Sequence, residues 1–456
     1  MNALSRTMDR NVTLGQSLSW LALSLVLLTL GAHFYRAGEY GIALCALGMI
    51  AFLSAGSGWK PYAAALFLCW GALEWGDSAY ALARMRLGFG MPWLRGTAIL
   101  LAVGALTALA GWFAFRRADA KERAKQREQP GSPLLQGLVF MAVFLALFCL
   151  RKSAPLNFLL LERYLPVLGS MQIFFAAWYG AFVAGQLLEK RKSRAFRKAV
   201  WLLFACVFFT QFFLGLLNIP GMLLTGKLHA PIPAFIIFAP IFRESFSMMP
   251  IIVLIATLLA GSAWCSHLCY FGPFDSLTAG NKAARPLPPF LAAAQTWGRP
   301  AVLVAGSLAA LGLRYAGLDT PTAVSIVVVF ALASLLIMAA LSRRYGVMVH
   351  CTTFCPTGLV VNLLGRLSPW RIRVDASRCD NCGACEKICR YSAIDAEIRS
   401  RGATRLRCSL CRDCTTVCKN NAVAVHCPGL APENAKKLFV GLAASLHALF
   451  LCVAMV

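Results

Sequence analysis

The chain has 456 residues, of which 59% are hydrophobic and only 14% are charged. A soluble domain carries roughly 25% charged residues, so this composition excludes an ordinary soluble protein and indicates a chain that lies largely in lipid. The formal net charge is +25, but the basic residues gather in alternate loops between apolar runs, which argues against a nucleic-acid-binding protein.

Apolar runs long enough to cross a bilayer recur along the chain. A membrane-spanning helix needs roughly 20 mainly apolar residues. The first run is not followed by the small-residue cleavage site of a secretory peptide, so we expect a retained anchor. Altogether we predict eleven spans, at approximately Gly15–Phe34, Tyr40–Trp59, Pro61–Asp77, Thr97–Phe115, Leu134–Leu150, Leu165–Leu188, Ala199–Leu217, Phe246–Trp264, Pro300–Ala316, Pro321–Leu341 and Leu438–Val456.

The distribution of Lys and Arg predicts the orientation of these spans. With the N-terminus inside, the inner loops hold 34 of the 44 basic residues. Cytoplasmic loops of membrane proteins are enriched in Lys and Arg. We therefore predict a multi-pass protein of the bacterial inner membrane, with a cytoplasmic N-terminus and a periplasmic C-terminus.

Changes in composition divide the chain into five segments. Near 231–243 the core contains a short apolar piece, Ile232–Phe242, that holds Pro233 and Pro240. We predict it to be re-entrant because it is too short to cross. The expected segments are a four-helix transmembrane block of unknown role (1–115), a basic cytoplasmic linker (116–133), a six-helix transmembrane core (134–365), a polar cysteine-dense module (366–432) and a last transmembrane helix (437–456).

The cysteine-dense module contains two C-x2-C-x2-C-x3-C runs, "CDNCGACEKIC" and "CSLCRDCTTVC", which begin 29 residues apart. In two-cluster ferredoxins, three thiolates of such a run bind one [4Fe–4S] cluster and the fourth binds the other. A zinc ribbon would use two C-x2-C pairs and leave the remaining thiols without a role. We predict one cluster on Cys379, Cys382, Cys385 and Cys418, and a second on Cys408, Cys411, Cys414 and Cys389.

Two further cysteine pairs each have the spacing C-x3-C-x2-G and follow predicted spans: Cys265 with Cys269, and Cys351 with Cys355. The predicted topology places all four thiols on the inner side. Residues four apart on a helix lie about one turn apart on one face. Two facing pairs could therefore supply four soft ligands for a third cluster or another thiophilic metal.

Several alternatives remain open for these pairs. They could be unrelated packing residues, or each could form a reversible disulfide, which the reducing inner compartment disfavours. His267 and His350 are candidate replacement ligands. We expect Pro356 to end its helix, and Gly272 and Gly358 to let the backbone bend away.

The tandem runs resemble the bacterial-type two-cluster ferredoxins, over roughly Arg371–Gly429. Arg390 and Lys419 stand where that family usually has proline. With the C-x3-C motifs and the spans included, roughly Leu134–Gly429 resembles the membrane-bound polyferredoxin family, which is related to membrane components of periplasmic nitrate reductase and nitrous-oxide reductase systems. The first C-x3-C motif departs from that family in having Tyr270 where proline is the norm.

The resemblance implies a mainly α-helical polytopic membrane protein with a small α+β ferredoxin-like 2[4Fe–4S] domain on the cytoplasmic face. It also implies electron transfer between those clusters and the quinone pool or an unidentified periplasmic or membrane oxidoreductase. Lys227, His229 and Arg243 border the expected re-entrant segment and are candidates to face a quinone headgroup. The flavinylation signature of the nitrous-oxide branch is absent, so we expect no covalent FMN.

We predict no catalytic residue, because no independent substrate site is recognised. The expected partners are a redox protein, the quinone pool and membrane lipid, and no nucleic acid. Two other functional classes remain open: a redox-sensing or maturation factor for a partner enzyme, and a transporter with regulatory clusters.

Overall fold

The structure is a computed structural model that describes residues 3–54, 58–125, 132–154, 157–222, 232–245, 248–280 and 282–453. The chain forms two compact units, Met1–Gly185 and Gln186–Val456. Each unit is described by itself below.

The N-terminal unit is a bundle of helices. Two of its long helices, α3 and α4, pack closely because glycines on α4 leave room for the α3 backbone: a Cβ at Gly111 would lie 3.0 Å from the backbone oxygen of Ala65. Small residues allow this close approach between apolar helices. The elements are α1 (Ala3–Arg36), α2 (Tyr40–Ser54), α3 (Lys60–Gly88), α4 (Leu94–Lys125), α5 (Pro133–Ser153), α6 (Leu160–Tyr164), the 3-10 turn η1 (Pro166–Leu168) and α7 (Gly169–Leu188), whose last residues belong to the second unit.

The C-terminal unit combines long apolar helices with short elements that carry the cysteines. Its membrane-type helices and their connections are α8 (Ser193–Leu216), α9 (Phe235–Arg243), α10 (Met248–Ala260), η2 (Gly261–Ala263), α11 (Trp264–His267), α12 (Gly272–Ala279), α13 (Pro289–Tyr315), α14 (Thr320–Ile337), η3 (Met338–Ser342), α15 (Arg343–Tyr345), η4 (His350–Phe354), α16 (Pro356–Leu364) and α20 (Pro432–Val453). Between α16 and α20 lie β1 (Arg371–Val374), η5 (Ala376–Arg378), α17 (Ala384–Ile388), α18 (Ala396–Ser400), α19 (Asp413–Val417) and β2 (Val423–His426).

The chain is mainly helical, as predicted, and seven helices within the described residues are long and apolar enough to cross a membrane, which is compatible with a multi-pass protein. The other four predicted spans fall on α1, α2, α3 and α13; they are helical, and as membrane spans they stay predictions. The seven are Leu94–Asp119, Pro133–Ser153, Gly169–Leu188, Ser193–Leu216, Met248–His267, Thr322–Tyr345 and Pro432–Val453.

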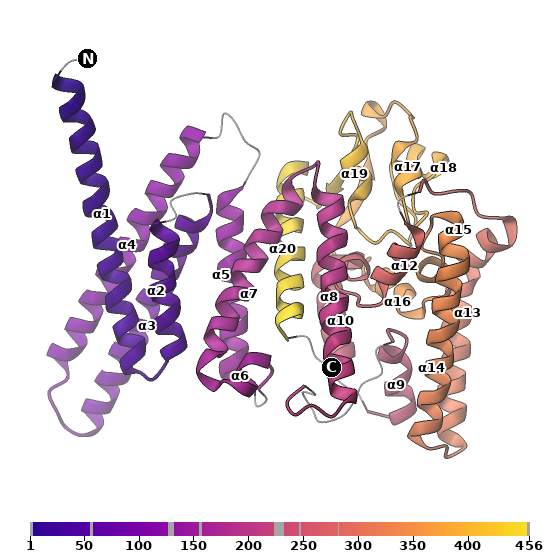
Figure 1. Cartoon of the computed structure of the whole chain (residues 1–456), viewed down its shortest axis with the longest axis horizontal. Coiled ribbons are helices and arrows are strands. Elements are labelled where there is room, and N and C mark those ends of the chain that lie inside the picture. Colours follow the sequence, from indigo (N-terminus) through magenta and orange to yellow (C-terminus); the bar gives the residue numbers. More distant parts are fainter. Residues whose placement is uncertain are drawn as a thin grey trace. The chain divides into compact units, whose positions relative to one another are not determined.

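The cysteine-dense segment folds into a small module whose two ends meet. Strands β1 and β2 pair antiparallel, with Arg371 opposite His426 and Val374 opposite Val423. In the part of the chain between the two strands, α17 and α19 lie next to each other. Figure 1 shows α17, α18 and α19 together at one end of the helices of the C-terminal unit. The chain thus enters and leaves the module on adjacent strands and then continues directly into α20.

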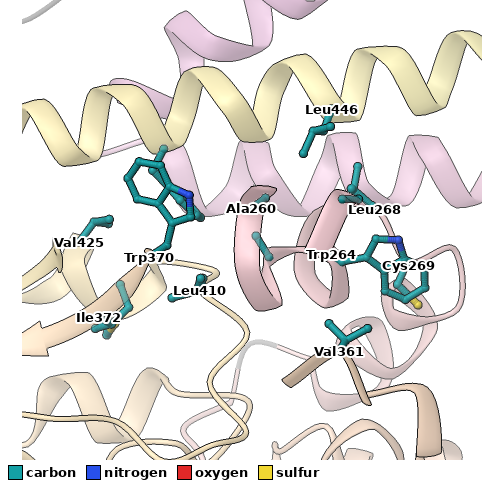
Figure 2. Packing of buried hydrophobic residues seen from close by; sticks show 14 of the residues in the cluster. Ala260, Trp264, Leu268, Cys269, Val361, Trp370, Ile372, Leu410, Val425 and Leu446 are labelled. Atoms are coloured by element: carbon teal, nitrogen blue, oxygen red, sulfur yellow. The ribbon is translucent and has the colours of Figure 1, made fainter. Parts of the chain in front are cut away.

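The module is packed onto the apolar helices by a shared hydrophobic core (Figure 2). Trp370, just before β1, donates a hydrogen bond from its indole nitrogen to the backbone oxygen of Leu259 over 2.8 Å. Its ring also lies 5.4 Å from that of Phe439 on α20. A large aromatic ring with its polar atom satisfied is well suited to such a buried junction. This core holds the module against α10 and α20.

Candidate iron–sulfur site

The two C-x2-C-x2-C-x3-C runs adopt the same backbone, including three left-handed positions in each. A left-handed conformation costs a non-glycine residue roughly 1–2 kcal/mol, so its repetition reflects a geometry that both motifs require. The equivalent residues, 29 apart, are Asn381 and Leu410 (φ 57° and 53°), Gly383 and Arg412 (69° and 65°), and Ser392 and Asn421 (46° and 51°).

The last cysteine of each run receives a backbone hydrogen bond at its sulfur. The amide of Ala393 donates to Cys389 Sγ over 3.3 Å, and the amide of Ala422 donates to Cys418 Sγ over 3.2 Å. Hydrogen bonds to a sulfur favour its charged form, which is the form that binds iron. The Ala-Ile and Ala-Val pairs after the two runs therefore supply amides to the ligand sulfurs.

The structure brings together Cys408, Cys411, Cys414 and the crossing Cys389. The Cys414 thiol lies within electrostatic range of the other three. Burial, assisted by these neighbours, raises the pKa of Cys389 and of Cys408 to about 11 and that of Cys411 to about 12. Cysteine binds iron as a thiolate, so iron binding at this site would release protons from these thiols.

The other predicted quartet is more open to solvent. Cys385 is buried, whereas Cys382 is exposed. Cys379 and Cys385 both lie within electrostatic range of Arg399, and Cys418 packs against the same apolar core as these two cysteines. The adjacent helices α17 and α19 position the two runs against each other.

Each C-x3-C pair has a local structure that differs from the predicted one. Cys265 lies in α11 and Cys351 in η4, but Cys269 and Cys355 come just after these turns. The Cys269 amide donates to Trp264 O over 2.9 Å, and the Cys355 amide to His350 O over 3.0 Å. Both bonds span five residues, as in a π-type turn. The expectation of two cysteines one α-helical turn apart is thus wrong in the same way in both motifs.

The turn η4 ends at Phe354, just before Pro356, as expected, whereas Gly272 and Gly358 lie in the first turns of α12 and α16 and do not bend the chain away. Pro356 is the first residue of α16, a position that suits proline because that amide has no helical partner. The amide of Gly358 donates to Cys355 Sγ over 3.3 Å, and Gly272 donates in the same way to Cys269. The motif C-x3-C-x2-G therefore places a glycine amide on the second sulfur.

The four C-x3-C thiols lie together in the interior. The Cys265 thiol is within electrostatic range of those of Cys269 and Cys355, and the Cys351 thiol is within range of the same two. Burial, with Cys355 as neighbour, raises the pKa of Cys269 to about 12. All eighteen cysteines lie within the described residues and none forms a disulfide. Two motifs separated by more than eighty residues thus form one thiol group, in which Cys269 is buried and the other three cysteines are half-buried.

One cation and one carboxyl face this thiol group. The guanidinium of Arg299 donates from Nε to Thr352 O over 2.9 Å and lies within electrostatic range of Cys265, Cys351 and Cys355. Asp275 is fully buried and accepts the Cys351 amide at Oδ2 over 2.9 Å. Burial raises the pKa of Asp275 to about 6.

The two histidines that were candidate replacement ligands are both buried. His267 Nδ1 lies 2.9 Å from Ser266 Oγ, and its Nε2 has no hydrogen-bond partner among the described residues. His350 packs edge-on against Phe271 and Phe330. Within the described part of the chain, no three His, Cys, Asp or Glu side chains are grouped so that they could hold a single metal ion.

The segment that carries Cys265 and Cys269 contacts the second ferredoxin run directly. Ser262 Oγ donates to Cys408 O over 2.5 Å, and Ser266 Oγ donates to Ser409 O over 2.7 Å. Sequence reasoning missed both serines, although they lie on either side of Cys265 in "GSAWCS". They join the C-x3-C thiol group to the backbone of a predicted cluster ligand.

A buried ion pair, also missed from sequence, fastens the module to α8. Arg197 donates from Nη2 to Asp413 Oδ2 over 2.9 Å and from Nη1 to Ser266 O over 3.0 Å. The side chains of Arg197 and Asp413 are each 4% exposed. No local pattern could have found this pair, because its members are 216 residues apart.

The site has donor groups that suit a negatively charged cluster. Ser409 Oγ is buried and has no hydrogen-bond partner among the described residues. Ser409 lies between Cys408 and Cys411 in the chain, and Arg412 is within electrostatic range of Cys411 and Cys414. A buried donor left without a partner is costly. The position of both side chains beside four thiols fits an iron–sulfur cluster.

Comparisons with known proteins agree with this chemistry. Two protein-family models, each described as a 4Fe-4S binding domain, match the chain: one over residues 244–286 and 324–375, which contain both C-x3-C motifs, and one over residues 372–395, which contain the first ferredoxin run. An uncharacterized protein of Methanocaldococcus jannaschii is 27% identical over 77 residues, which are 17% of this chain and 30% of that relative. No solved structure matches the chain. The C-terminal region thus contains an iron–sulfur, ferredoxin-type module.

Proposed function

We propose that this chain is a membrane-bound electron relay with three iron–sulfur centres, two in the ferredoxin module and one on the C-x3-C thiols. The observation that carries the proposal is the direct contact between the segment of Cys265 and the loop of Cys408, made by two serine hydrogen bonds. A [4Fe–4S] cluster in each site would accept and donate one electron at a time. The family match over both C-x3-C motifs supports the third centre.

The contacts support one order for the proposed relay. The crossing ligands Cys389 and Cys418 tie the two ferredoxin quartets to each other. Each is the last cysteine of one run and would bind the cluster that is held by the first three cysteines of the other run. The quartet that includes Cys408 is the one that contacts the C-x3-C segment. Electrons therefore pass between the more exposed quartet and the C-x3-C site through the quartet of Cys389, Cys408, Cys411 and Cys414.

The protein supplies positive charge around the buried centres. Arg299 faces the C-x3-C thiols, and Arg197 and Arg412 lie beside Cys411. A cluster with four thiolates is an anion, and nearby guanidinium groups favour its more negative, reduced form. We infer that these arginines raise the reduction potentials of the inner centres.

Quinol is the membrane-side electron carrier in this proposal. An apolar cavity of about 130 Å³ lies between α9, α13 and α14, and Phe330 is part of its wall. The ring of Phe330 is 6.4 Å from that of His350, the neighbour of Cys351. A quinone ring in this cavity would be close to the C-x3-C site. Arg243 also lines the cavity, whereas Lys227 and His229 lie outside the described residues.

The relay faces the cytoplasm in this proposal, in the bacterial inner membrane. The support is the excess of Lys and Arg in the loops on the side of the module. A redox protein that docks at the exposed quartet would be the other electron partner, as part of a larger oxidoreductase system.

Iron counting with EPR tests the third centre. We expect anaerobically purified Cys265→Ser/Cys351→Ser protein to contain about four fewer irons than wild type and to keep the EPR signals of the ferredoxin module. A Cys206→Ser variant is the control, because that cysteine is exposed on α8. An unchanged iron count would remove the third centre, and iron-free wild-type protein would remove the relay.

A further inference from the structure

A cavity of about 610 Å³ lies where the ferredoxin module meets the ends of three candidate membrane helices. We call it the interface cavity. Its wall includes the last residues of α7, the first residue of α8 and the first turn of α20: Leu187, Leu188, Ser193, Pro432, Glu433 and Lys436. Figure 1 shows α8, α20 and the module helix α19 close together in this unit. Three helices of membrane length that end at one cavity place it at the level of lipid headgroups.

The interface cavity is positively charged. Two of its cations are paired, Arg378 with Asp375 and Lys436 with Glu433, at 3.5 and 3.6 Å. Asp375 and Glu433 are the two acidic residues of the wall, and both are used in these pairs. Lys190, Arg373 and Arg412 remain as excess positive charge. Such a site favours an anion.

A buried donor inside the interface cavity also lacks a partner. Arg412 is 3% exposed and lines the cavity. Its Nη2 donates to Leu187 O over 3.2 Å, but its Nε has no partner among the described residues. A buried guanidinium can donate further hydrogen bonds, and phosphate is a preferred acceptor.

The apolar part of the wall selects the kind of anion. Leucine and valine side chains from α7, the sheet and the loop before α20 line the same space as the cations. A free phosphate would bury this apolar surface poorly. A phospholipid would place its phosphate on the cations and the start of its acyl chains on the leucines.

We propose that the interface cavity binds the phosphate-bearing headgroup of an anionic phospholipid, which fastens the ferredoxin module to the membrane surface. Lys190 also links the lipid site to the redox centres, because its Nζ donates a hydrogen bond to Cys418 O over 2.9 Å. A bound anion beside Cys418 disfavours the reduced, more negative cluster. This redox consequence rests on the proposed function, whereas lipid binding does not.

The test uses the full-length protein in nanodiscs of phosphatidylcholine with or without phosphatidylglycerol. Lipid that remains bound after transfer to detergent is identified by native mass spectrometry. We expect about one retained phosphatidylglycerol in wild type and at least about tenfold less in Arg373→Gln/Lys436→Gln. The matched control is Arg401→Gln/Lys437→Gln, which removes two nearby charges that do not line the cavity and should retain lipid as wild type does.

A second variant covers the case in which the double substitution does not fold. Ala424 lines the cavity and pairs with Arg373 across the sheet, so Ala424→Glu adds an opposing charge without removing a cation. We expect it to lose the lipid as well. Equal retention in cavity and control variants would overturn the proposal, and so would full displacement of phosphatidylglycerol by millimolar inorganic phosphate.

The redox readout separates this proposal from the relay itself. Phosphatidylglycerol should make the reduction midpoint of the exposed quartet more negative in wild type and leave it unchanged in Ala424→Glu. Specific lipid retention in protein that contains no iron would support the lipid site and contradict the relay. Protein with normal iron–sulfur clusters but no specific lipid retention would support the relay and contradict the lipid site.

Discussion

Tyr391, in the ferredoxin module, donates a hydrogen bond from its hydroxyl to the backbone oxygen of Cys265 over 3.2 Å. The side chain is buried, and it lies within electrostatic range of Cys351 and Cys411 as well. One aromatic ring thus touches the surroundings of both the C-x3-C site and the neighbouring ferredoxin quartet.

The first prediction concerns this ring. Tyr391→Phe keeps the packing and loses one hydrogen bond, so we expect a cost of about 1 kcal/mol in stability and little change in electron transfer. Tyr391→Leu removes the ring and should slow electron exchange between the two centres at an unchanged iron content. Rapid-freeze EPR during reoxidation measures this exchange. Tyr345→Phe, which loses a hydroxyl elsewhere, is the control, and equal rates in Tyr391→Leu and wild type would contradict the role.

The crossed ligation gives a second prediction. If Cys418 belongs to the cluster of Cys379, then Cys418→Ser and Cys379→Ser should remove the same EPR signal. Cys389→Ser should instead match Cys408→Ser. Redox-titrated EPR of the four variants decides the assignment, since uncrossed ligation would group Cys418→Ser with Cys408→Ser.

Close packing around the first C-x3-C motif gives a third prediction. A Cβ at Gly272 would lie 2.4 Å from Trp201 Cζ2. Because an overpacked core costs about 1–3 kcal/mol, we expect Gly272→Ala to lower the thermal midpoint of the detergent-solubilised protein. The cost should shrink in a Trp201→Phe background. Gly312→Ala is the control, because no atom lies within 4 Å of a Cβ at that position, and an equal effect there would contradict the steric explanation.

The buried pair of Arg197 and Asp413 gives a fourth prediction. Removing one partner leaves an uncompensated buried charge, which costs about 3–5 kcal/mol. We therefore expect Arg197→Gln to release the module from α8, as measured by hydrogen exchange of α19. Arg401→Gln, which breaks an exposed pair with Glu397, should cost about 1 kcal/mol or less. Unchanged exchange in Arg197→Gln would show that the apolar core alone holds the module.

The apolar cavity between α9, α13 and α14 gives a fifth prediction. Ala309 lines this cavity, and a phenylalanine there would fill it. Ala309→Phe should lower the rate of cluster reduction by a quinol analogue at unchanged iron content. Ala301→Phe on the same helix, outside the cavity, is the control. Equal rates in both variants would place the quinol site elsewhere.

Features that depend only on residues close together in the chain could be predicted from the sequence. The spacing of the tandem cysteine runs indicated iron–sulfur ligation, because a short loop can turn successive thiolates toward one cluster. Seven of the eleven predicted spans coincide with helices of membrane length and polarity, since hydropathy over about 20 residues is a local property. The repeat C-x3-C-x2-G marked both motifs of the C-x3-C thiol group.

Only the tertiary structure decided which parts of the chain meet. The hydrogen bond from Tyr391 to Cys265 joins residues 126 apart, and the pair of Arg197 and Asp413 joins residues 216 apart. The structure also shows that the second cysteine of each C-x3-C motif lies just after the helical turn. A turn that spans five residues there presents the cysteine sulfur to the amide of a glycine further along the chain. Such contacts depend on the packing of whole helices against one another, and no local period in a sequence encodes that packing.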